Sequence, residues 1–266
     1  MINFDRFPGN TRKILTMSYD DGKTPDRRLV EIFNRYGIRG TFHINAGYLD
    51  NERLDRIASD EVRELYKGHE ISAHGYTHQS LGITPREMVI SETMKDRLAL
   101  EKLAGYPVRG MSYPNGLYND DTVSILKACG IEYCRVVETT AAFKMPEDFM
   151  RWQGTCHHKQ NLLELGQAFL DQPYKNRPHL MYVWGHANEF DKDDNWSLIE
   201  DFCKMMSGKD DIWYATNIEI VDYMNALKQL RFSADLSMVY NPTALDLIIS
   251  KGSEPVYIPS GKQVNL

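Results

Sequence analysis

Two carboxylates and two histidines stand at spacings that could hold a metal ion. Asp20 is followed directly by Asp21, and His74 precedes His78 by four residues. Adjacent carboxylates repel each other unless a cation or a shared proton lies between them, although adjacent aspartates before a glycine are also typical of a turn. One carboxylate with two imidazoles leaves an open position on Zn²⁺, which is the pattern of a catalytic metal site.

The histidine spacing excludes one familiar kind of zinc enzyme. In the zinc-protease pattern a glutamate stands next to the first histidine. Here Gly75 occupies that position, after His74. The pair therefore predicts a metal site of another type.

The elements that must position these residues are short apolar runs that alternate with helical patterns. We expect strands at 14–19, 41–45, 70–73, 111–113, 133–137, 180–184 and 212–215. We expect helices at 25–36, 85–103, 121–129, 162–170, 195–206 and 216–230. Thr84 with Glu87, and Thr216 with Glu219, predict capping boxes.

Roughly seven strand–helix repeats in about 230 residues predict an α/β fold with a parallel sheet and crossover helices. Such units most economically close into a barrel. An open doubly wound sheet is the alternative, but no G-x-G-x-x-G follows any expected strand. The aspartates and histidines follow the carboxyl ends of expected strands, which is the edge where parallel α/β folds bind ligands.

The end of the chain has a different pattern. From Ser233 onward, apolar and polar residues alternate, and Gly252, Pro255, Pro259 and Gly261 interrupt the alternation. Period-two patterning with turn residues predicts short antiparallel strands. We therefore expect a barrel at 1–230 and a small C-terminal antiparallel β extension, packed on the barrel, at 231–266.

Composition narrows the class of partner. The chain has 266 residues and a formal net charge of −6, without a basic run, so we expect neither nucleic acid nor an anionic membrane as a partner. Its four cysteines form no C-x-x-C pair, which favours reduced thiols. The N-terminus lacks the basic and apolar blocks of a secretory signal, so we expect a cytoplasmic protein unless a leader has been removed.

Four segments together resemble the motifs of a known family. They are 18–22, with the two aspartates; 74–78, with the two histidines; 112–116, Ser-Tyr-Pro-Asn-Gly; and 183–186, an apolar strand that ends in His186. In this order they are similar to the motifs of the polysaccharide deacetylase family, also called the NodB-homology or carbohydrate esterase family four group. The resemblance covers roughly Arg12 to Tyr223. It implies a distorted (β/α) barrel of about seven parallel strands and a metal-dependent deacetylase.

The resemblance also implies roles for five residues. Asp21, His74 and His78 would hold one divalent metal, Zn²⁺ before Ni²⁺ or Co²⁺. Asp20 would act as the general base, and His186 would protonate the departing amine as the general acid. This agrees with the chemistry, because a metal lowers the pKa of a bound water and a nearby free carboxylate can accept its proton.

Other residues would contact the substrate. By the resemblance, Asn115 supplies a backbone N–H for the oxyanion, and Tyr113 belongs to the same motif. Trp152 is a candidate for lining an acetyl pocket. Glu189 and the histidines at 157–158 are further polar candidates.

The third motif departs from the family pattern. Many members have an arginine where this chain has Ser112, and that arginine orients the base. Arg151 is the first candidate to replace it and Arg109 is the second.

The sequence thus predicts a hydrolase that removes an N-acetyl or O-acetyl group from a carbohydrate. The alternatives are hydrolysis of another non-peptide C–N bond, in a cyclic amide or ureide, and a catalytically silent sugar-binding relative. A cytoplasmic location favours soluble oligosaccharides or small amides as substrates. The particular sugar, the native metal and the oligomeric state stay open.

Overall fold

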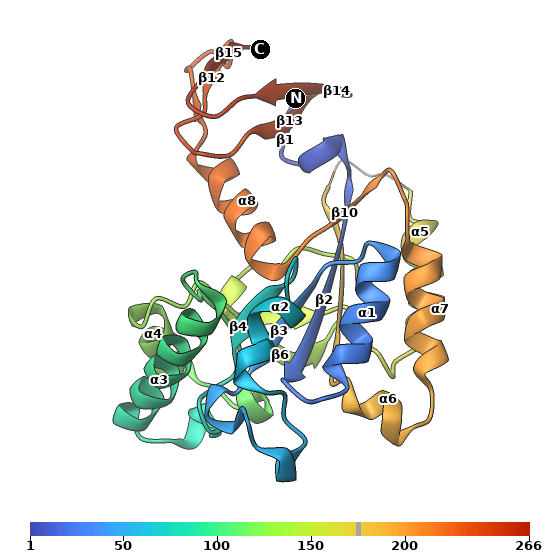
Figure 1. The fold of residues 1–266 in the computed structure, drawn as a ribbon. Coiled ribbons are helices and arrows are strands. Elements are labelled where there is room, and N and C mark those ends of the chain that lie inside the picture. Colours follow the sequence, from blue (N-terminus) through green and yellow to red (C-terminus); the bar gives the residue numbers. More distant parts are fainter. Residues whose placement is uncertain (174–176) are drawn as a thin grey trace.

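The computed structural model describes residues 1–173 and 177–266. At its centre is a sheet in which every strand pair is parallel (Figure 1). Within the described residues, its strands are β2 (Lys13–Asp21), β3 (Gly40–Ile44), β4 (Glu70–Ala73), β5 (Gly110–Ser112), β6 (Tyr133–Thr139), β7 (Trp152–Gly154), β8 (Cys156–His157), β9 (His179–Gly185) and β10 (Ile212–Tyr214).

The sheet closes into a distorted barrel through β7 and β8. The strand order is β7-β6-β5-β4-β3-β2-β9-β8, and only Thr155 separates β7 from β8 along the chain. The segment that carries both strands therefore pairs with β6 on one side and with β9 on the other. β10 pairs with the first residues of β2, outside this ring. The predicted distorted barrel of about seven parallel strands is confirmed, and its last member is the interrupted segment 152–157, which has no continuous strand pattern.

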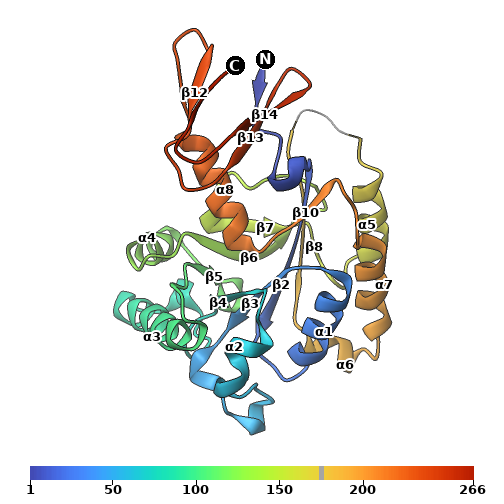
Figure 2. The ribbon, with the colours of Figure 1, turned by 45° about the horizontal axis from the view of Figure 1, so that its top comes forward.

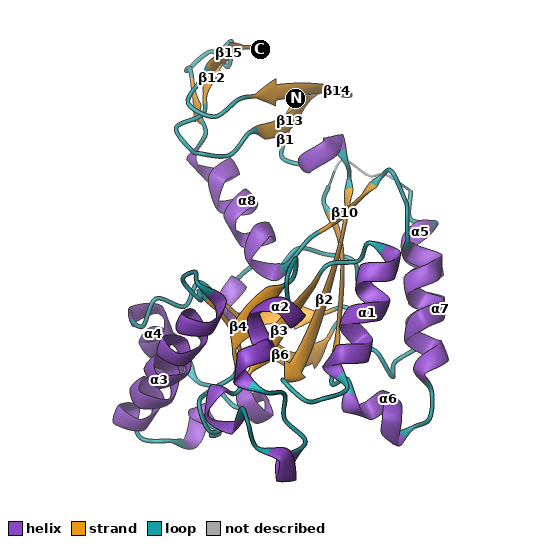
Figure 3. Ribbon diagram, viewed as in Figure 1, coloured by secondary structure: helices purple, strands orange, loops and turns teal. Residues whose placement is uncertain are grey.

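Helices surround the barrel (Figure 3). They are α1 (Asp26–Tyr36), α2 (Val62–Leu65), α3 (Arg86–Ala104), α4 (Asp120–Ala128), α5 (Leu162–Leu170), α6 (Asn188–Lys192), α7 (Trp196–Met206) and α8 (Asn217–Gln229). Short 3₁₀ turns lie between some of these elements. In the described part of the chain, no helix has both the length and the apolar character that crossing a bilayer requires.

One of the two expected capping boxes is present. At the start of α8, the Glu219 carboxylate accepts the backbone N–H of Thr216 at 2.9 Å. The expected box of Thr84 with Glu87 is wrong, because no side chain caps α3. The Thr84 hydroxyl instead donates to the backbone oxygen of Ser80 at 2.7 Å, within the preceding turn.

Two small antiparallel sheets lie beyond the end of the barrel where β2 begins (Figures 1 and 2). One contains β1 (Ile2–Asn3), β13 (Leu247–Lys251) and β14 (Glu254–Ile258); the other contains β11 (Arg231–Phe232), β12 (Met238–Tyr240) and β15 (Gln263–Asn265). The predicted antiparallel extension is confirmed, and the first strand of the chain joins it. The division into domains at 230/231 stays a prediction.

A second apolar cluster, separate from the main core, joins the extension to the barrel. Its buried members include Phe7, Ile14, Tyr223, Leu227, Val239, Leu247, Ile249 and Ile258. A buried polar contact adds to it: Arg6 Nε donates to Ser250 Oγ at 2.7 Å, and that hydroxyl donates to Asp5 at 2.6 Å. The extension is therefore packed on the barrel by both kinds of contact.

Candidate metal and catalytic site

The two adjacent aspartates are the last two residues of β2. Because side chains alternate along a strand, they point in different directions: Asp20 is buried, at 3% exposure, whereas Asp21 is partly exposed. The φ angle of Asp21 is 88° and that of Gly22 is 62°. A positive φ is strained for a residue other than glycine and is a feature of many functional sites.

Helix α3 holds the loop that carries the two histidines. Its Asp96 accepts the backbone N–H of His74 at 2.9 Å and that of Ala46 at 2.8 Å. Its Glu92 accepts the backbone N–H of Thr77 at 2.6 Å and the Thr77 hydroxyl at 2.8 Å. Burial raises the pKa of Asp96 to about 7. Two carboxyl groups of one helix thus fix the loop after β4 at both ends of the histidine pair.

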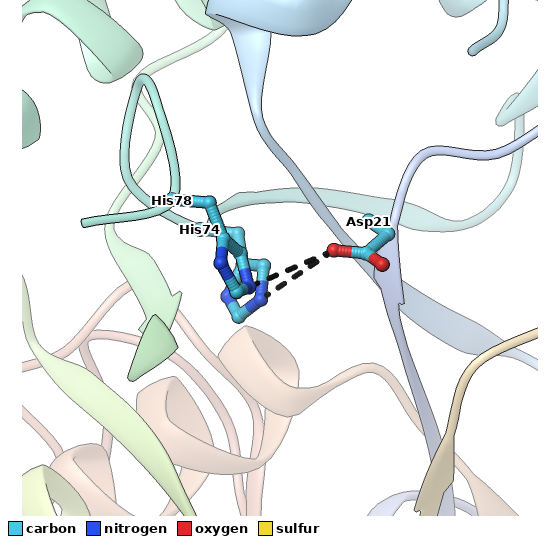
Figure 4. A group of neighbouring side chains, drawn as sticks. All are labelled: Asp21, His74 and His78. Atoms are coloured by element: carbon cyan, nitrogen blue, oxygen red, sulfur yellow. Dashed lines mark ion pairs between the residues drawn. The ribbon is translucent and has the colours of Figure 1, made fainter. Parts of the chain in front are cut away.

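Asp21, His74 and His78 bring three metal-ligating atoms together (Figure 4). Asp21 Oδ1 lies 3.9 Å from His74 Nε2 and 3.8 Å from His78 Nε2. The two imidazole rings meet edge to face, with centroids 4.8 Å apart. The sequence-predicted ligands therefore converge from β2 and from the loop after β4.

The hydrogen bonds of His74 leave one ring nitrogen available for a cation. Its Nδ1 lies 3.0 Å from the backbone oxygen of Ser112, which can only accept, so Nδ1 carries the proton and Nε2 has a lone pair. That lone pair faces Asp20 Oδ2 at 3.8 Å and Asp21 Oδ1 at 3.9 Å. Burial lowers the pKa of His74 to about 4, which keeps the ring neutral at pH 7. Three electron-rich atoms that face one another fit a divalent cation.

Asp20 is held on both of its oxygens. Oδ1 accepts the Ser112 hydroxyl at 3.1 Å, and Oδ2 forms a buried ion pair with the Arg135 guanidinium. Burial alone would raise the pKa of Asp20, but the charge of Arg135, followed by that of His74, outweighs burial and holds the pKa well below its ordinary value. The side chain is therefore a carboxylate at neutral pH.

Arg135 is the site residue that the sequence analysis missed. It is the register partner of Ser112 in the β5–β6 pair, so its guanidinium reaches Asp20 from the strand next to the small serine. The guanidinium also lies 4.1 Å from the centre of the Trp184 ring. A charged residue within the apolar run 133–137 was the available signal, because arginine is almost never fully buried without a partner.

The two arginines expected to orient Asp20 are occupied elsewhere. Arg151 forms an ion pair with Asp148 at 2.5 Å, and Arg109 forms one with Asp222 at 2.6 Å. Within the described part of the chain, neither has an ion pair or a hydrogen bond with Asp20. The expectation that Arg151 or Arg109 replaces the motif-three arginine is corrected by these contacts.

His186 follows β9 directly, and β9 is a neighbour of β2 in the sheet. Its Nδ1 lies 3.3 Å from Glu189 Oε2, and its backbone N–H donates to the same oxygen at 3.1 Å. Burial lowers the pKa of His186, but the hydrogen bond to Glu189 and the charges of Asp20 and Asp21 outweigh burial and raise it. The side chain is 30% exposed, so a ligand can reach it.

The third motif forms a tight turn after β5. Tyr113 is buried, donates its hydroxyl to the backbone oxygen of Met150 at 3.0 Å and stacks on Tyr118 with ring centroids 4.6 Å apart. Asn115 is exposed, has a φ of 56° and donates its side-chain amide to Ser80 Oγ at 2.9 Å. The Tyr113 side chain thus supports the turn from inside, and Asn115 lies on its outer surface.

Trp152 belongs to the core. It is 0% exposed, and the rings of Tyr133, Tyr182 and Phe149 surround it edge to face. The expectation that its indole lines an acetyl pocket is corrected, because β7 turns this side chain into the second apolar cluster.

A comparison with protein families matches residues 8–134 to the family described as polysaccharide deacetylase. Those residues include all three predicted metal ligands and Asp20, so the resemblance is confirmed. A curated relative, the poly-beta-1,6-N-acetyl-D-glucosamine N-deacetylase of Staphylococcus aureus (strain MRSA252), is 24% identical over 158 residues, which cover 54% of this chain and 53% of the relative. The chain thus spans about half the length of the curated relatives it matches.

Solved structures share the barrel. Puue allantoinase superposes with a TM-score of 0.65 and 13% identity, over 81% of this chain and 91% of the allantoinase. A pseudoenzyme of carbohydrate esterase family four from Bacillus anthracis superposes with a TM-score of 0.52 and 12% identity, over 79% of this chain and 65% of the other. At these identities the likeness shows the fold alone.

Proposed function

Because residues 8–134 match the polysaccharide deacetylase family, we propose that this chain hydrolyses an acetyl group from a carbohydrate with the help of a divalent cation. An N-acetyl group is the first substrate class, as in the name of the S. aureus relative, and an O-acetyl group is the second. One observation carries the proposal: the ionised carboxylate of Asp20 lies directly beside the ligand set of Asp21, His74 and His78.

Asp21, His74 and His78 would hold the cation. Two imidazoles and one carboxylate favour Zn²⁺, with Ni²⁺ or Co²⁺ as alternatives. When bound, the cation supplies Lewis-acid activation of a water molecule and of the acyl carbonyl. The backbone carbonyl of Ser112 keeps the Nδ1 proton of His74 in place, which leaves Nε2 free for this role.

Asp20 accepts the proton of the attacking water. Its Oδ2 lies 3.8 Å from His74 Nε2, at the edge of the ligand set. Ser112 and Arg135 bind the two oxygens, so the carboxylate cannot rotate freely and stays ionised. The ion pair with Arg135 therefore both orients the base and keeps it in its proton-accepting form.

Asn115 and His186 act on the tetrahedral centre that forms when water attacks. The backbone N–H of Asn115, on the exposed turn, donates a hydrogen bond to the oxyanion. His186 donates a proton to the leaving amine from Nε2, because its Nδ1 is held by Glu189. Glu189 thus positions His186, whereas the sequence predicted a contact with the substrate.

A second candidate is hydrolysis of a cyclic amide or ureide. The barrel shared with Puue allantoinase supports it, as does Ser112 at the position where many deacetylases have arginine. A catalytically silent sugar-binding protein is the third candidate, in line with the pseudoenzyme of the same fold. The presence of Asp20 together with the three ligands argues against it.

The test is an acetate-release assay on acetylated oligosaccharides, run beside a ring-opening assay on small cyclic amides. We expect acetate release that a chelator abolishes and added Zn²⁺ restores. Asp20→Asn is the matched control, because it removes the base and leaves the ligand set in place. Ring opening without acetate release would favour the second candidate, and sugar binding without either reaction would favour the third.

A further inference from the structure

A second group of metal-ligating side chains surrounds Glu189. Its Oε2 lies 3.1 Å from His157 Nε2, 3.3 Å from His158 Nε2 and 3.3 Å from His186 Nδ1. The ligand atoms of His157, His158 and Glu189 all lie within 4.8 Å of one another. We propose that these three residues bind a second divalent cation, and the donor set of two imidazoles and one carboxylate favours Zn²⁺.

The fold brings two adjacent histidines to the same carboxylate because β8 ends between them. His157 is the last residue of β8, and His158 leaves the strand with its backbone N–H bonded to the Trp184 oxygen at 2.9 Å. Its ring lies against Gly185, where a Cβ atom would come within 2.1 Å of His158 Nδ1. The ring also stacks on Phe190, with centroids 4.2 Å apart. A glycine and an aromatic ring thus fix the imidazole in place beside Glu189.

His158 lacks the hydrogen bonds that its burial requires. The residue is 1% exposed, and among the described residues neither of its ring nitrogens has a hydrogen-bond partner. Its Nε2 is close to Glu189 Oε2, but the direction is not that of a hydrogen bond. A buried polar group without a partner destabilises the fold, so this imidazole calls for a further group at the site.

A cation between these atoms meets that requirement. In a tetrahedral Zn²⁺ site with bonds of about 2.0–2.1 Å, neighbouring ligand atoms are roughly 3.3 Å apart and their lone pairs point at the metal, not at each other. The Glu189–His157 and Glu189–His158 spacings of 3.1 and 3.3 Å agree with such a site. Burial lowers the pKa of His158 to about 3, so its ring is neutral and can donate a lone pair.

A network of hydrogen bonds without a cation explains less of this geometry. His157 Nδ1 accepts the backbone N–H of Lys159 at 3.2 Å, so the proton of the neutral ring is on Nε2 and faces Glu189. This proton and the one on His186 Nδ1 satisfy two contacts with Glu189, but both nitrogens of His158 are left without a partner among the described residues. A cation bound at His157 Nε2 would move the ring proton to Nδ1 and replace the contact with Lys159. The nearby ammonium of Lys159 is closer to Asp193, at 2.7 Å, than to Glu189 Oε1, at 3.4 Å. The Oε2 side of Glu189 therefore faces the three imidazoles and the backbone N–H of His186, and the cation would share this oxygen with His186.

The test counts bound zinc. Zn²⁺ is titrated into the metal-free full chain by calorimetry, and the bound metal is measured after gel filtration. We expect two equivalents in the wild type, one in His157→Ala, one in His78→Gln and none in the double variant. His157 is near the surface, and its loss should weaken the second site by more than about 100-fold. Glu164→Gln, which removes an exposed carboxylate outside both ligand groups, should keep both equivalents.

The outcomes separate this site from the catalytic one. A single equivalent that is lost in His78→Gln and retained in His157→Ala would overturn the second site. A single equivalent that is lost in His157→Ala and retained in His78→Gln would support the second site. It would also show that Asp21, His74 and His78 do not bind the cation of the proposed deacetylase reaction. His158→Phe keeps the stacking on Phe190 without offering a ligand, so it repeats the test in a variant that retains the packing. Two equivalents in both His157→Ala and His158→Phe would overturn the residue assignment.

Discussion

The two ends of the barrel are built from opposite kinds of side chain. Where β2 ends, polar and charged side chains gather: Asp20 forms an ion pair with Arg135, and His74 Nε2 lies 3.8 Å from Asp20 Oδ2 and 3.9 Å from Asp21 Oδ1. Where β2 begins, an apolar cluster joins the barrel to the antiparallel extension, and members such as Leu247 are fully buried. Figures 1 and 2 show the extension at this second end.

The difference separates chemistry from stability. Even a paired buried charge adds little to stability. The buried ion pair of Asp20 with Arg135 is therefore explained by its effect on a bound ligand. Burial of apolar side chains stabilises the fold, at roughly 25 cal/mol per Å². Substitutions at the carboxyl end of the strands should therefore change turnover, whether or not they also change stability, and substitutions at the other end should change the free energy of unfolding alone.

Asp20→Asn should have the largest effect on turnover. The amide keeps the shape of the side chain but cannot accept the water proton, so we expect kcat/KM to fall about 10³-fold. Zinc content should stay at the wild-type level, because the three ligands remain. Wild-type turnover in the zinc-loaded variant would refute Asp20 as the base.

Arg135→Gln should have the second largest effect. The substitution leaves the Asp20 carboxylate buried without its charged partner, and we expect a loss of about 3 kcal/mol in the free energy of unfolding. The pKa of Asp20 is depressed in the folded protein, so its ion pair stabilises the fold above the unfolded pKa and is lost as pH falls. Without Arg135 that pKa rises, and the acidic limb of the pH–rate profile should move to higher pH. An unchanged acidic limb would contradict this assignment.

His186→Gln should lower kcat/KM by about 10²-fold, because the leaving amine then departs without a proton donor. The pKa of His186 is raised, so its imidazole should still be protonated at the ordinary histidine pKa of about 6.5. The wild type should lose activity only when the pH exceeds the raised pKa. In Glu189→Gln the main group that raises this pKa is gone, and the alkaline limb should move to lower pH. The measurement is kcat/KM against pH for the three proteins, and an alkaline limb that stays in place in His186→Gln would exclude His186.

Sequence reasoning found the residues whose position follows from strand order. Asp21, His74 and His78 could be placed together because the carboxyl ends of parallel strands meet at one edge, and their spacing matched a family motif. The interrupted segment 152–157 could not be identified as a barrel strand, because one residue between two short strands hides the pattern.

Arg135 and the second histidine group depend on information that no single segment contains. Arg135 reaches Asp20 because the register of β5 and β6 sets it opposite Ser112. Similarly, adjacent residues on a strand point to opposite sides, so His157 and His158 could not be expected to share Glu189. They do so because the strand ends between them. Register and strand ends are consequences of tertiary packing.

Leu247→Ala tests the other end of the barrel. The side chain is fully buried in the cluster below the extension, so the substitution should cost about 3 kcal/mol in the free energy of unfolding. The kcat/KM of the folded variant should stay within about twofold of the wild type. Urea unfolding and an acetate-release assay at low temperature measure the two quantities. A large loss of turnover at unchanged stability would contradict the assignment of catalysis to one end of the barrel and stability to the other.

Arg151→Gln should have the smallest effect and is the matched control for Arg135→Gln. Both variants lose one guanidinium, but Arg151 is partly exposed and paired with Asp148 and Asp120, whereas Arg135 is buried against Asp20. Exposed ion pairs contribute at most about 1 kcal/mol, so we expect stability and kcat/KM close to the wild type, with the acidic limb of the pH–rate profile unmoved. If Arg151→Gln instead moved that limb as far as Arg135→Gln does, a partly exposed guanidinium would influence the pKa of Asp20 as strongly as the buried one. Burial against Asp20 would then no longer distinguish the arginine that orients the base from an arginine at the surface.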